Sequence, residues 1–267
     1  MTTVKILDIP ISAVTYGDVL LHIEDYIASG KPHHIITVNP EIILHSQKNE
    51  TMRKALLSSS LNTPDGIGLI WASKFNSLKQ SGSLISNIPI FLVTAFAVVC
   101  NKKWLSSQLP MRVTGIDLVE QITKKAYDTK WKILFLGAKD GAAQLACNTL
   151  SKKYNIPTNQ FISSDLNPTD PEAIKAVKDF KPDILLVAYG SPKQEIFIYS
   201  NLEKLATPVV IGVGGSFDFI SGKTMRAPKF MRSLSLEWLW RIILQPSRIA
   251  RIVRAVVVFP LKVLLSK

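Results

Sequence analysis

Short apolar runs alternate with segments of helical periodicity along most of the chain. One apolar run covers residues 35–39 and ends at Pro40, and residues 41–58 then follow a helical pattern. Thr15 and Asp18 have the spacing of a capping box and predict a helix that ends before Gly30. Strand-length runs that alternate with helices are typical of a parallel sheet covered by helices.

The second half of the chain repeats this alternation. The pattern predicts a strand at 132–136, a loop at 137–141, helices at 142–154 and 171–180, a strand at 183–188, a loop at 189–192, a helix at 193–205 and a strand at 209–213. We therefore predict an α/β fold for residues 1–222, with Rossmann-like parallel-sheet elements.

Residues 73–109 break the alternation, and we interpret them as an insertion in this core. They contain the longest apolar run of the chain, 88–100, which is bordered by Lys102, Lys103 and Trp104. The run is too short to span a bilayer as a helix, which takes about 20 residues. Two interpretations stay open: a buried helix or hairpin that covers the core, which we favour, and a shallow element that dips into a membrane.

The distribution of charge separates the C-terminus from the rest of the chain. The 267 residues carry a formal net charge of +12, but residues 223–267 hold ten basic side chains against the single acidic Glu237. Most of the positive charge therefore belongs to a C-terminal appendage, and it favours an acidic partner such as a phosphorylated substrate or an anionic lipid.

The end of this appendage has the pattern of an amphipathic helix. A helical wheel drawn from Pro246 onward separates a basic side, Arg248, Arg251 and Arg254, from an apolar side, Ile249, Ile252, Val253, Val256 and Val257. We favour association with an anionic membrane surface. A helix docked on the core with solvated arginines stays open, and nucleic-acid binding is least favoured because no reading motif is present.

Several classes of function lack support in the sequence. Cys100 and Cys147 show no spacing typical of a disulfide framework or a zinc site, and a reducing compartment fits them. The N-terminus has no pattern of a secretory signal. Motifs for acyl transfer, zinc hydrolysis and protein phosphorylation are absent from the sequence. We also find no Asp-x-Asp pair that would hold Mg²⁺ and expect neither a metal nor another cofactor.

One candidate site combines two loops in the first half of the chain. Asp65 lies beside Gly66 and Gly68, which permit close backbone approach to a ligand, and its carboxylate is a candidate general base. Thr37 and Asn39 stand at the carboxyl end of a predicted strand, where open α/β sheets bind ligands. An Asp-Gly turn that only caps a helix is the alternative.

Three glycine-containing loops in the second half follow predicted strands. They begin at Gly137, Gly190 and Gly212. Each loop alone is weak as a signal, because none is a dinucleotide fingerprint or a P-loop. Three such loops at strand ends together indicate a crevice for a nucleotide or nucleotide sugar.

Taken together, these motifs resemble the WecG/TagA/CpsF family of bacterial glycosyltransferases. The resemblance rests on the blocks Thr37–Glu41, Pro64–Gly68, Arg112–Leu118, Phe135–Ala138, Lys181–Leu185, Tyr189–Glu195, Gly212–Asp218, Arg226–Pro228 and Leu236–Arg241. They follow one another in order over nearly the whole chain, apart from residues 73–109, where typical members have a much shorter link.

The resemblance implies an inverting, metal-independent transfer of a sugar, often N-acetylmannosamine or its uronic acid. The donor would be a UDP-sugar and the acceptor a sugar linked to polyprenyl diphosphate on the cytoplasmic face of the membrane. A non-catalytic protein that binds nucleotide sugars at the membrane is the alternative. The donor sugar, the polymer and the oligomeric state stay open, and a homo-oligomer is one possibility.

The resemblance also assigns roles to residues. Asp65 would be the base with Thr37 and Asn39 beside it, Arg112 would compensate diphosphate charge, and Gln194 would orient a substrate. The remaining substrate-binding candidates are Thr114, Asp117, Gly137, Gly190, Glu195, Gly214 and Asp218. Arg226, Arg241, Arg248, Arg251 and Arg254 would meet the acceptor diphosphate or anionic lipid and help to close the site.

Overall fold

A computed structural model describes residues 2–80 and 84–266 of the chain. Residues 81–83 of the expected insertion and Lys267 of the appendage lie outside the described residues.

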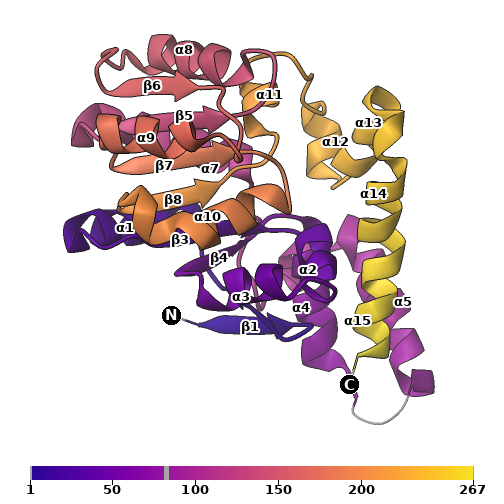
Figure 1. Cartoon of the computed structure of the whole chain (residues 1–267). Helices are drawn as coiled ribbons and strands as arrows, with labels where there is room; N and C mark the ends of the chain where they lie inside the picture. The colour runs from indigo at the N-terminus through magenta and orange to yellow at the C-terminus, as the bar shows by residue number, and fades with distance from the viewer. Residues whose placement is uncertain (1, 81–83, 267) are drawn as a thin grey trace.

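The centre of the molecule is a six-stranded parallel sheet with the order β4-β3-β8-β7-β5-β6 (Figure 1). Its strands are β3 (His33–Val38), β4 (Leu61–Pro64), β5 (Ile133–Gly137), β6 (Phe161–Ser164), β7 (Ile184–Ala188) and β8 (Val209–Gly212). A separate antiparallel hairpin joins β1 (Thr3–Ile6) and β2 (Ile9–Ser12). The carboxyl ends of the parallel strands are directed toward the C-terminal helices.

Both faces of this sheet are covered, which explains why its strands read as continuous apolar runs. All residues of β5 and β7 are buried. Ile133 and Phe135 belong to one apolar cluster, and their neighbours Leu134 and Leu136 belong to another. Because alternate side chains of a strand point to opposite faces, the two clusters form the core on either side of the sheet.

Helices of the core connect and cover the strands. They are α1 (Tyr16–Ser29), α2 (Pro40–Ser46), α3 (Glu50–Ser58), α4 (Ile67–Leu78), α7 (Gly115–Thr129), α8 (Ala142–Tyr154), α9 (Pro171–Phe180), α10 (Lys193–Leu205) and α11 (Ser216–Ile220). The predicted capping box of α1 is present, with Thr15 and Asp18 bonding to each other's backbone N–H groups. The predicted α/β fold is confirmed.

The single helix predicted for 41–58 is wrong in one respect. The chain forms α2 and α3 instead, with a break between them. The physical reason is Asn49, whose side chain accepts a hydrogen bond from Met52 N at 2.9 Å and caps a new helix.

The segment 73–109 divides between the core and two further helices. Its first residues complete α4, and the rest forms α5 (Leu84–Cys100) and α6 (Lys102–Leu105). One side of α5 packs on α4, since Trp71 and Phe91 meet edge to face at 5.3 Å. The other side is exposed, including Ile85 at 81% and Phe96 at 71%. The expectation of a buried helix or hairpin therefore holds for only one face of a helix.

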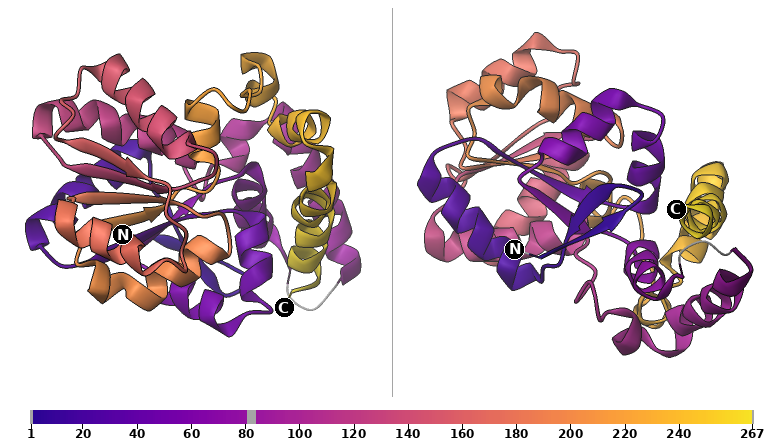
Figure 2. Two further views of the ribbon diagram at one scale, coloured as in Figure 1. Left: turned by 45° about the horizontal axis from the view of Figure 1, so that its top comes forward. Right: turned by 90° about the horizontal axis from the view of Figure 1, so that it is seen from below.

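The C-terminal residues form a column of helices beside α4 and α5 (Figure 2). The column contains α12 (Lys229–Ser233), α13 (Glu237–Leu244), a 3-10 turn at Pro246–Arg248, α14 (Ile249–Val253), a π-helical turn at Arg254–Val258 and α15 (Phe259–Leu265). Phe259 and Val263 are fully buried in the apolar cluster that also contains residues of α2 and α4. The end of the chain is thus anchored on the core.

Candidate active site

The carboxyl ends of β3 and β4 bring the first candidate loops together. Thr37 and Thr63 are register partners, and Asp65 N donates a 2.6 Å hydrogen bond to Val38 O. Asn39 begins α2, where its Oδ1 accepts a hydrogen bond from Ile42 N at 3.0 Å. The expected neighbourhood of Thr37, Asn39 and Asp65 is therefore present, because adjacent parallel strands end at the same edge of the sheet.

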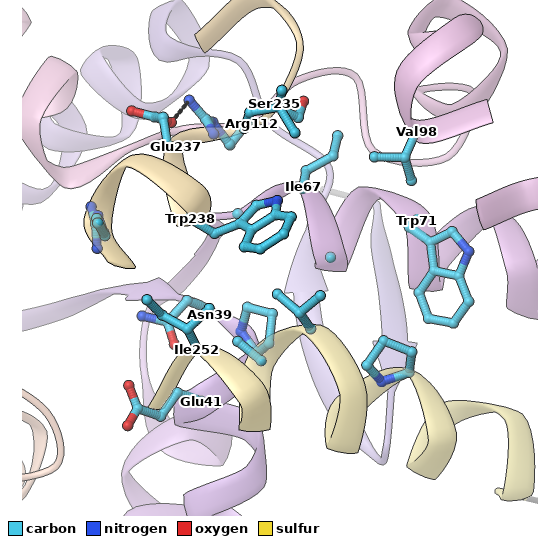
Figure 3. A pocket seen from close by; sticks show the side chains of 18 of the residues that line it. Asn39, Glu41, Ile67, Trp71, Val98, Arg112, Ser235, Glu237, Trp238 and Ile252 are labelled. Atoms are coloured by element: carbon cyan, nitrogen blue, oxygen red, sulfur yellow. Dashed lines mark ion pairs between the residues drawn. The ribbon is translucent and has the colours of Figure 1, made fainter. Parts of the chain in front are cut away.

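A cavity of about 570 Å³ lies between these loops, α5 and the C-terminal column (Figure 3). Six of the residues predicted for the site line it: Asn39, Asp65, Arg112, Arg241, Arg248 and Arg251. The core and the appendage thus contribute to one cavity.

Asp65 is under two opposing electrostatic influences. Burial raises the pKa of its carboxyl above the ordinary value, because a charge is costly to remove from water. The guanidinium groups of Arg112 and Arg241 and the N–H of Gly115, 3.5 Å from Oδ2, act in the opposite direction. A carboxylate with a raised pKa inside a cavity is suited to accept a proton.

Arg112 faces the cavity from the segment before α7. Its Nη2 lies 2.5 Å from the Glu237 carboxylate, an ion pair that joins the core to the start of α13. Arg241, one helical turn after Glu237, lies with its guanidinium carbon 5.3 Å from the centre of the Phe219 ring. Two cations therefore approach Asp65 from different elements.

The basic side of the last helices is directed toward the core. Arg251 donates to both oxygens of Glu41, with Nε and Nη2 at 2.8 to 2.9 Å. Arg248 is half-buried and lines the cavity beside it. Arg254 is exposed. The expected amphipathic pattern is present, but two of its three arginines contact the site while Val253 and Val257 remain about half exposed.

Thr114 and Asp117 are used within the protein. Thr114 caps α7, and its hydroxyl donates to Asp117 at 2.8 Å. Arg226 binds Asp117 with two parallel hydrogen bonds of 2.7 and 2.8 Å. Burial raises the pKa of Asp117, but the hydrogen bonds from Arg226 and Thr114 outweigh it and lower that pKa below the ordinary value. This ion pair connects the beginning of the appendage to the core.

Gln194 ties two of the glycine loops together. Its Oε1 accepts hydrogen bonds from Gly190 N and Gly214 N at 3.2 and 3.0 Å, and its Nε2 donates to Glu195 at 2.7 Å. The Thr37 hydroxyl similarly donates to Gly212 O at 2.9 Å. These side chains, 2% and 5% exposed, set the positions of the loops, and their predicted contact with substrate stays a prediction.

The loop at Gly137 lies beside the one at Tyr189. Gly137 has a φ of +92°, and a Cβ there would come within 2.6 Å of the Tyr189 ring, so only glycine fits. Lys223 donates to the Asp140 carbonyl in the same loop. Asp218, on α11, is half-buried, and burial raises its carboxyl pKa although Arg248 and Lys223 oppose this. The predicted crevice residues therefore surround the same edge of the sheet.

Among the lining residues that the sequence analysis did not assign to the site are two carboxylates and two tryptophans, Glu41, Glu237, Trp71 and Trp238. Glu237 was detectable as the one acidic residue of a basic segment, and Glu41 as the residue after Asn39-Pro40. Neither pattern indicates which arginine each carboxylate binds. Trp238 was interpreted as part of a membrane-associating segment, and no pattern singled out Trp71.

The side chains and helices of the described residues, 2–80 and 84–266, bear on metal binding and membrane crossing. No three His, Cys, Asp or Glu side chains there are grouped so that they could hold a metal ion. In the same part of the chain, every helix is too short or too polar to cross a bilayer.

Comparison with known proteins gives consistent matches over the whole chain. The profile of the "Glycosyl transferase WecG/TagA/CpsF family" matches residues 4–95 and 80–267. The chain is 26% identical over 266 residues to an N-acetylglucosaminyldiphosphoundecaprenol N-acetyl-beta-D-mannosaminyltransferase of Staphylococcus aureus strain NCTC 8325. The protein of the same name from strain MRSA252 is equally similar. Each match covers 99% of this chain and 93% of the relative.

Proposed function

The chain belongs to the WecG/TagA/CpsF family of glycosyltransferases, and we propose that it transfers an N-acetylmannosamine-type sugar from UDP to a sugar on polyprenyl diphosphate. The resemblance expected from the sequence blocks is confirmed, and the protein is a glycosyltransferase. The names of the relatives describe a transfer to N-acetylglucosaminyl-diphosphoundecaprenol, which supports this choice of donor sugar and acceptor.

The observation that carries the proposal is the position of Asp65 among arginines in the cavity at the strand ends. In an inverting transfer, Asp65 removes the proton of the acceptor hydroxyl as its oxygen attacks the anomeric carbon. The bond between that carbon and the UDP oxygen breaks, and UDP leaves with the electron pair on the opposite side of the sugar. We assign Asn39, at the end of the adjacent strand, the role of holding the acceptor.

The charge of a diphosphate needs compensation during this reaction. Arg112 and Arg241 face Asp65 from two elements, and Arg248 lines the same cavity. Guanidinium groups match phosphate oxygens in geometry and keep their charge at all relevant pH values. We assign them the role that Mg²⁺ has in many other glycosyltransferases, which makes the transfer metal-independent.

The acceptor also determines where the enzyme works. A polyprenyl chain holds its diphosphate at a membrane surface, so the enzyme binds there peripherally. We assign it to the cytoplasmic face, where UDP-sugars are present. Because the family is catalytic, a non-catalytic binding protein is the weaker interpretation.

Release of UDP by the purified full-length protein tests the proposal. A panel of UDP-sugars is supplied with and without a GlcNAc-diphosphate-prenyl acceptor, first in EDTA and then in Mg²⁺. We expect acceptor-dependent release in EDTA with UDP-N-acetylmannosamine. Release that requires Mg²⁺ would contradict metal independence, and release without dependence on the acceptor would contradict the transfer.

Replacement of the proposed base gives the second test. We expect Asp65→Asn to lower turnover by about 100-fold or more while UDP binding stays nearly unchanged, because the amide cannot take the proton. Loss of UDP binding in this variant would instead make Asp65 a donor-binding or structural residue.

A further inference from the structure

The cavity beside Asp65 has two chemically different ends. Arg112 and its partner Glu237 lie at one end, and Asp65 is close enough to Arg112 for its charge to act on the Asp65 pKa. The other end extends between α5 and the C-terminal column and is lined by Trp71, Phe91, Ala95, Val98, Val256 and Pro260. In Figure 3 the pair Arg112–Glu237 and the residue Trp71 stand at opposite sides of the view. We call the second end the apolar limb.

One wall of the limb is a continuous face of α5. Phe91, Ala95 and Val98 are spaced four and three residues apart, so they share one side of the helix. No residue between Leu84 and Cys100 is charged. Trp71, at the base, donates its Nε1–H to Thr94 Oγ1 at 3.0 Å, which satisfies its polar atom and leaves its ring beside the limb.

The helices that flank the limb are apolar on their outer surfaces as well. Leu92 and Phe96 of α5 are 61% and 71% exposed, and Val257 and Leu261 of the opposite helices are 49% and 47% exposed. Exposed apolar surface of this extent is typical of a contact with a membrane or a partner. These helices therefore present apolar side chains both to the cavity and to the outside of the molecule.

We propose that the apolar limb binds the first isoprene units of the acceptor, next to its diphosphate. A ligand that fits both ends must join an anionic head directly to a hydrocarbon chain. The inference rests on the proposed function, because that function requires a prenyl diphosphate in this cavity. It assigns α5 the role of holding the hydrocarbon chain and aligning the diphosphate-linked sugar with Asp65.

Binding of soluble prenyl diphosphates measures this directly. We use dimethylallyl, geranyl and farnesyl diphosphate in detergent-free buffer and determine dissociation constants by calorimetry. Each added unit buries more apolar surface, so we expect the wild type to bind the farnesyl compound at least about tenfold more tightly than the dimethylallyl compound. Equal affinity for all three would overturn the proposal.

Substitutions in the apolar limb then test whether the prenyl chain binds there. Ala95→Trp fills the limb from α5, and Val256→Trp fills it from the opposite wall, so that one of them suffices if the other misfolds. Both should lose the preference for farnesyl diphosphate over dimethylallyl diphosphate. Leu92→Trp, on the outer side of the same helix, should retain the preference. Loss of the farnesyl preference in Leu92→Trp, or its retention in both Ala95→Trp and Val256→Trp, would overturn the proposal.

The turnover assay separates this inference from the proposed function. Transfer that does not depend on prenyl length would leave the function intact and refute the limb. Chain-length-dependent binding that is lost in Ala95→Trp, without any sugar transfer, would support the limb and refute the function.

Discussion

The Asp65 carboxyl is poised between burial and the arginines around it. Burial favours its protonated form, and Arg112 and Arg241 favour its charged form. The balance leaves the Asp65 pKa raised, so the pH at which activity falls on the acidic side reports on the charges that face Asp65.

Replacement of Arg241 should shift the acidic side of the pH profile in a defined direction. Arg241→Gln removes a positive charge that lowers the Asp65 pKa, and the pKa must therefore rise further. We expect the fall of kcat/KM on the acidic side to shift to higher pH, by about half a unit or more. The measurement is the pH profile of kcat/KM for wild type and variant. Arg53→Gln, far from the cavity, is the control, and an unchanged acid limb in Arg241→Gln would contradict Asp65 as the base.

Glu195 is a second carboxyl whose pKa is raised by burial, and it lies next to Gln194, which ties the loops at Gly190 and Gly214 together. It is fully buried, and burial raises the pKa of its carboxyl to about 7 although the Gln194 hydrogen bond opposes this. Above the ordinary Glu pKa of about 4.3, the Glu195 carboxyl is therefore ionised in the unfolded state but still protonated in the folded state. The associated stability is present below that value and is lost as the pH rises through about 7.

Glu195→Gln should remove this pH dependence. We expect the free energy of unfolding of the wild type to fall by about 3 kcal/mol relative to the variant between pH 4.5 and pH 8. Denaturant unfolding across this range measures the effect. Glu203→Gln, on the exposed side of α10, should leave the wild-type slope in place. A parallel pH dependence in wild type and Glu195→Gln would show that Glu195 is ionised in the folded protein.

At the scale of elements, three ion pairs and one apolar anchor hold the appendage on the core. Arg226–Asp117, Arg112–Glu237 and Arg251–Glu41 join segments more than 100 residues apart. Phe259 and Val263 of α15 insert into the cluster shared with α2 and α4. The arrangement of these contacts fixes the cationic end of the cavity.

The pair Arg226–Asp117 should control how firmly the first part of the appendage is held. Arg226→Ala removes the two hydrogen bonds that Arg226 donates to the half-buried Asp117. We expect the free energy of unfolding to fall by about 1–3 kcal/mol, a loss moderated because both side chains are partly exposed. Hydrogen exchange should accelerate in residues 224–236. Arg53→Ala disrupts an exposed pair of 4.0 Å and serves as the control. Unchanged exchange in Arg226→Ala would show that the pair with Asp117 does not hold the first part of the appendage.

At the scale of the whole molecule, apolar residues of α5 face outward, while two arginines of the appendage bind carboxylates of the core. Phe96 and Ile85 are exposed, whereas Arg226 and Arg251 are engaged with core carboxylates. We expect membrane attachment to depend on apolar insertion and to resist salt better than a net charge of +9 on a solvated tail would.

Phe96→Glu tests this arrangement. Replacing an inserted aromatic ring by a carboxylate should weaken sedimentation with anionic vesicles by about tenfold or more, while UDP binding is retained. Leu21→Glu changes another exposed apolar residue, 59% exposed on α1, and should bind vesicles as the wild type does. Equal binding by all three proteins would mean that α5 does not contact the membrane.

The sequence predicted what short-range pattern determines. A strand with Thr37 and Asn39 at its carboxyl end was predicted, and the loop of Asp65 was expected beside them, but β4, the adjacent parallel strand that positions Asp65, was not predicted. The contact between Glu41 and Arg251 depends on how a helix column 210 residues away packs, and no local spacing encodes it. The role of 73–109 stayed open for the same reason, since an apolar run does not state which of its faces is covered. The boundary at 222 and the insertion remain predictions.

Two of the four arginines that line the cavity, Arg112 and Arg251, are already paired with carboxylates, and this pairing favours ligands that carry more than one negative charge. A membrane surface offers many phosphodiester headgroups with a single negative charge. Such a headgroup gains little at Arg112 or Arg251, because Glu237 and Glu41 already neutralise them. A diphosphate carries more charge and can share both guanidinium groups with their carboxylates. We expect the cavity to remain open to its rare diphosphate ligand in the presence of a large excess of ordinary phospholipid.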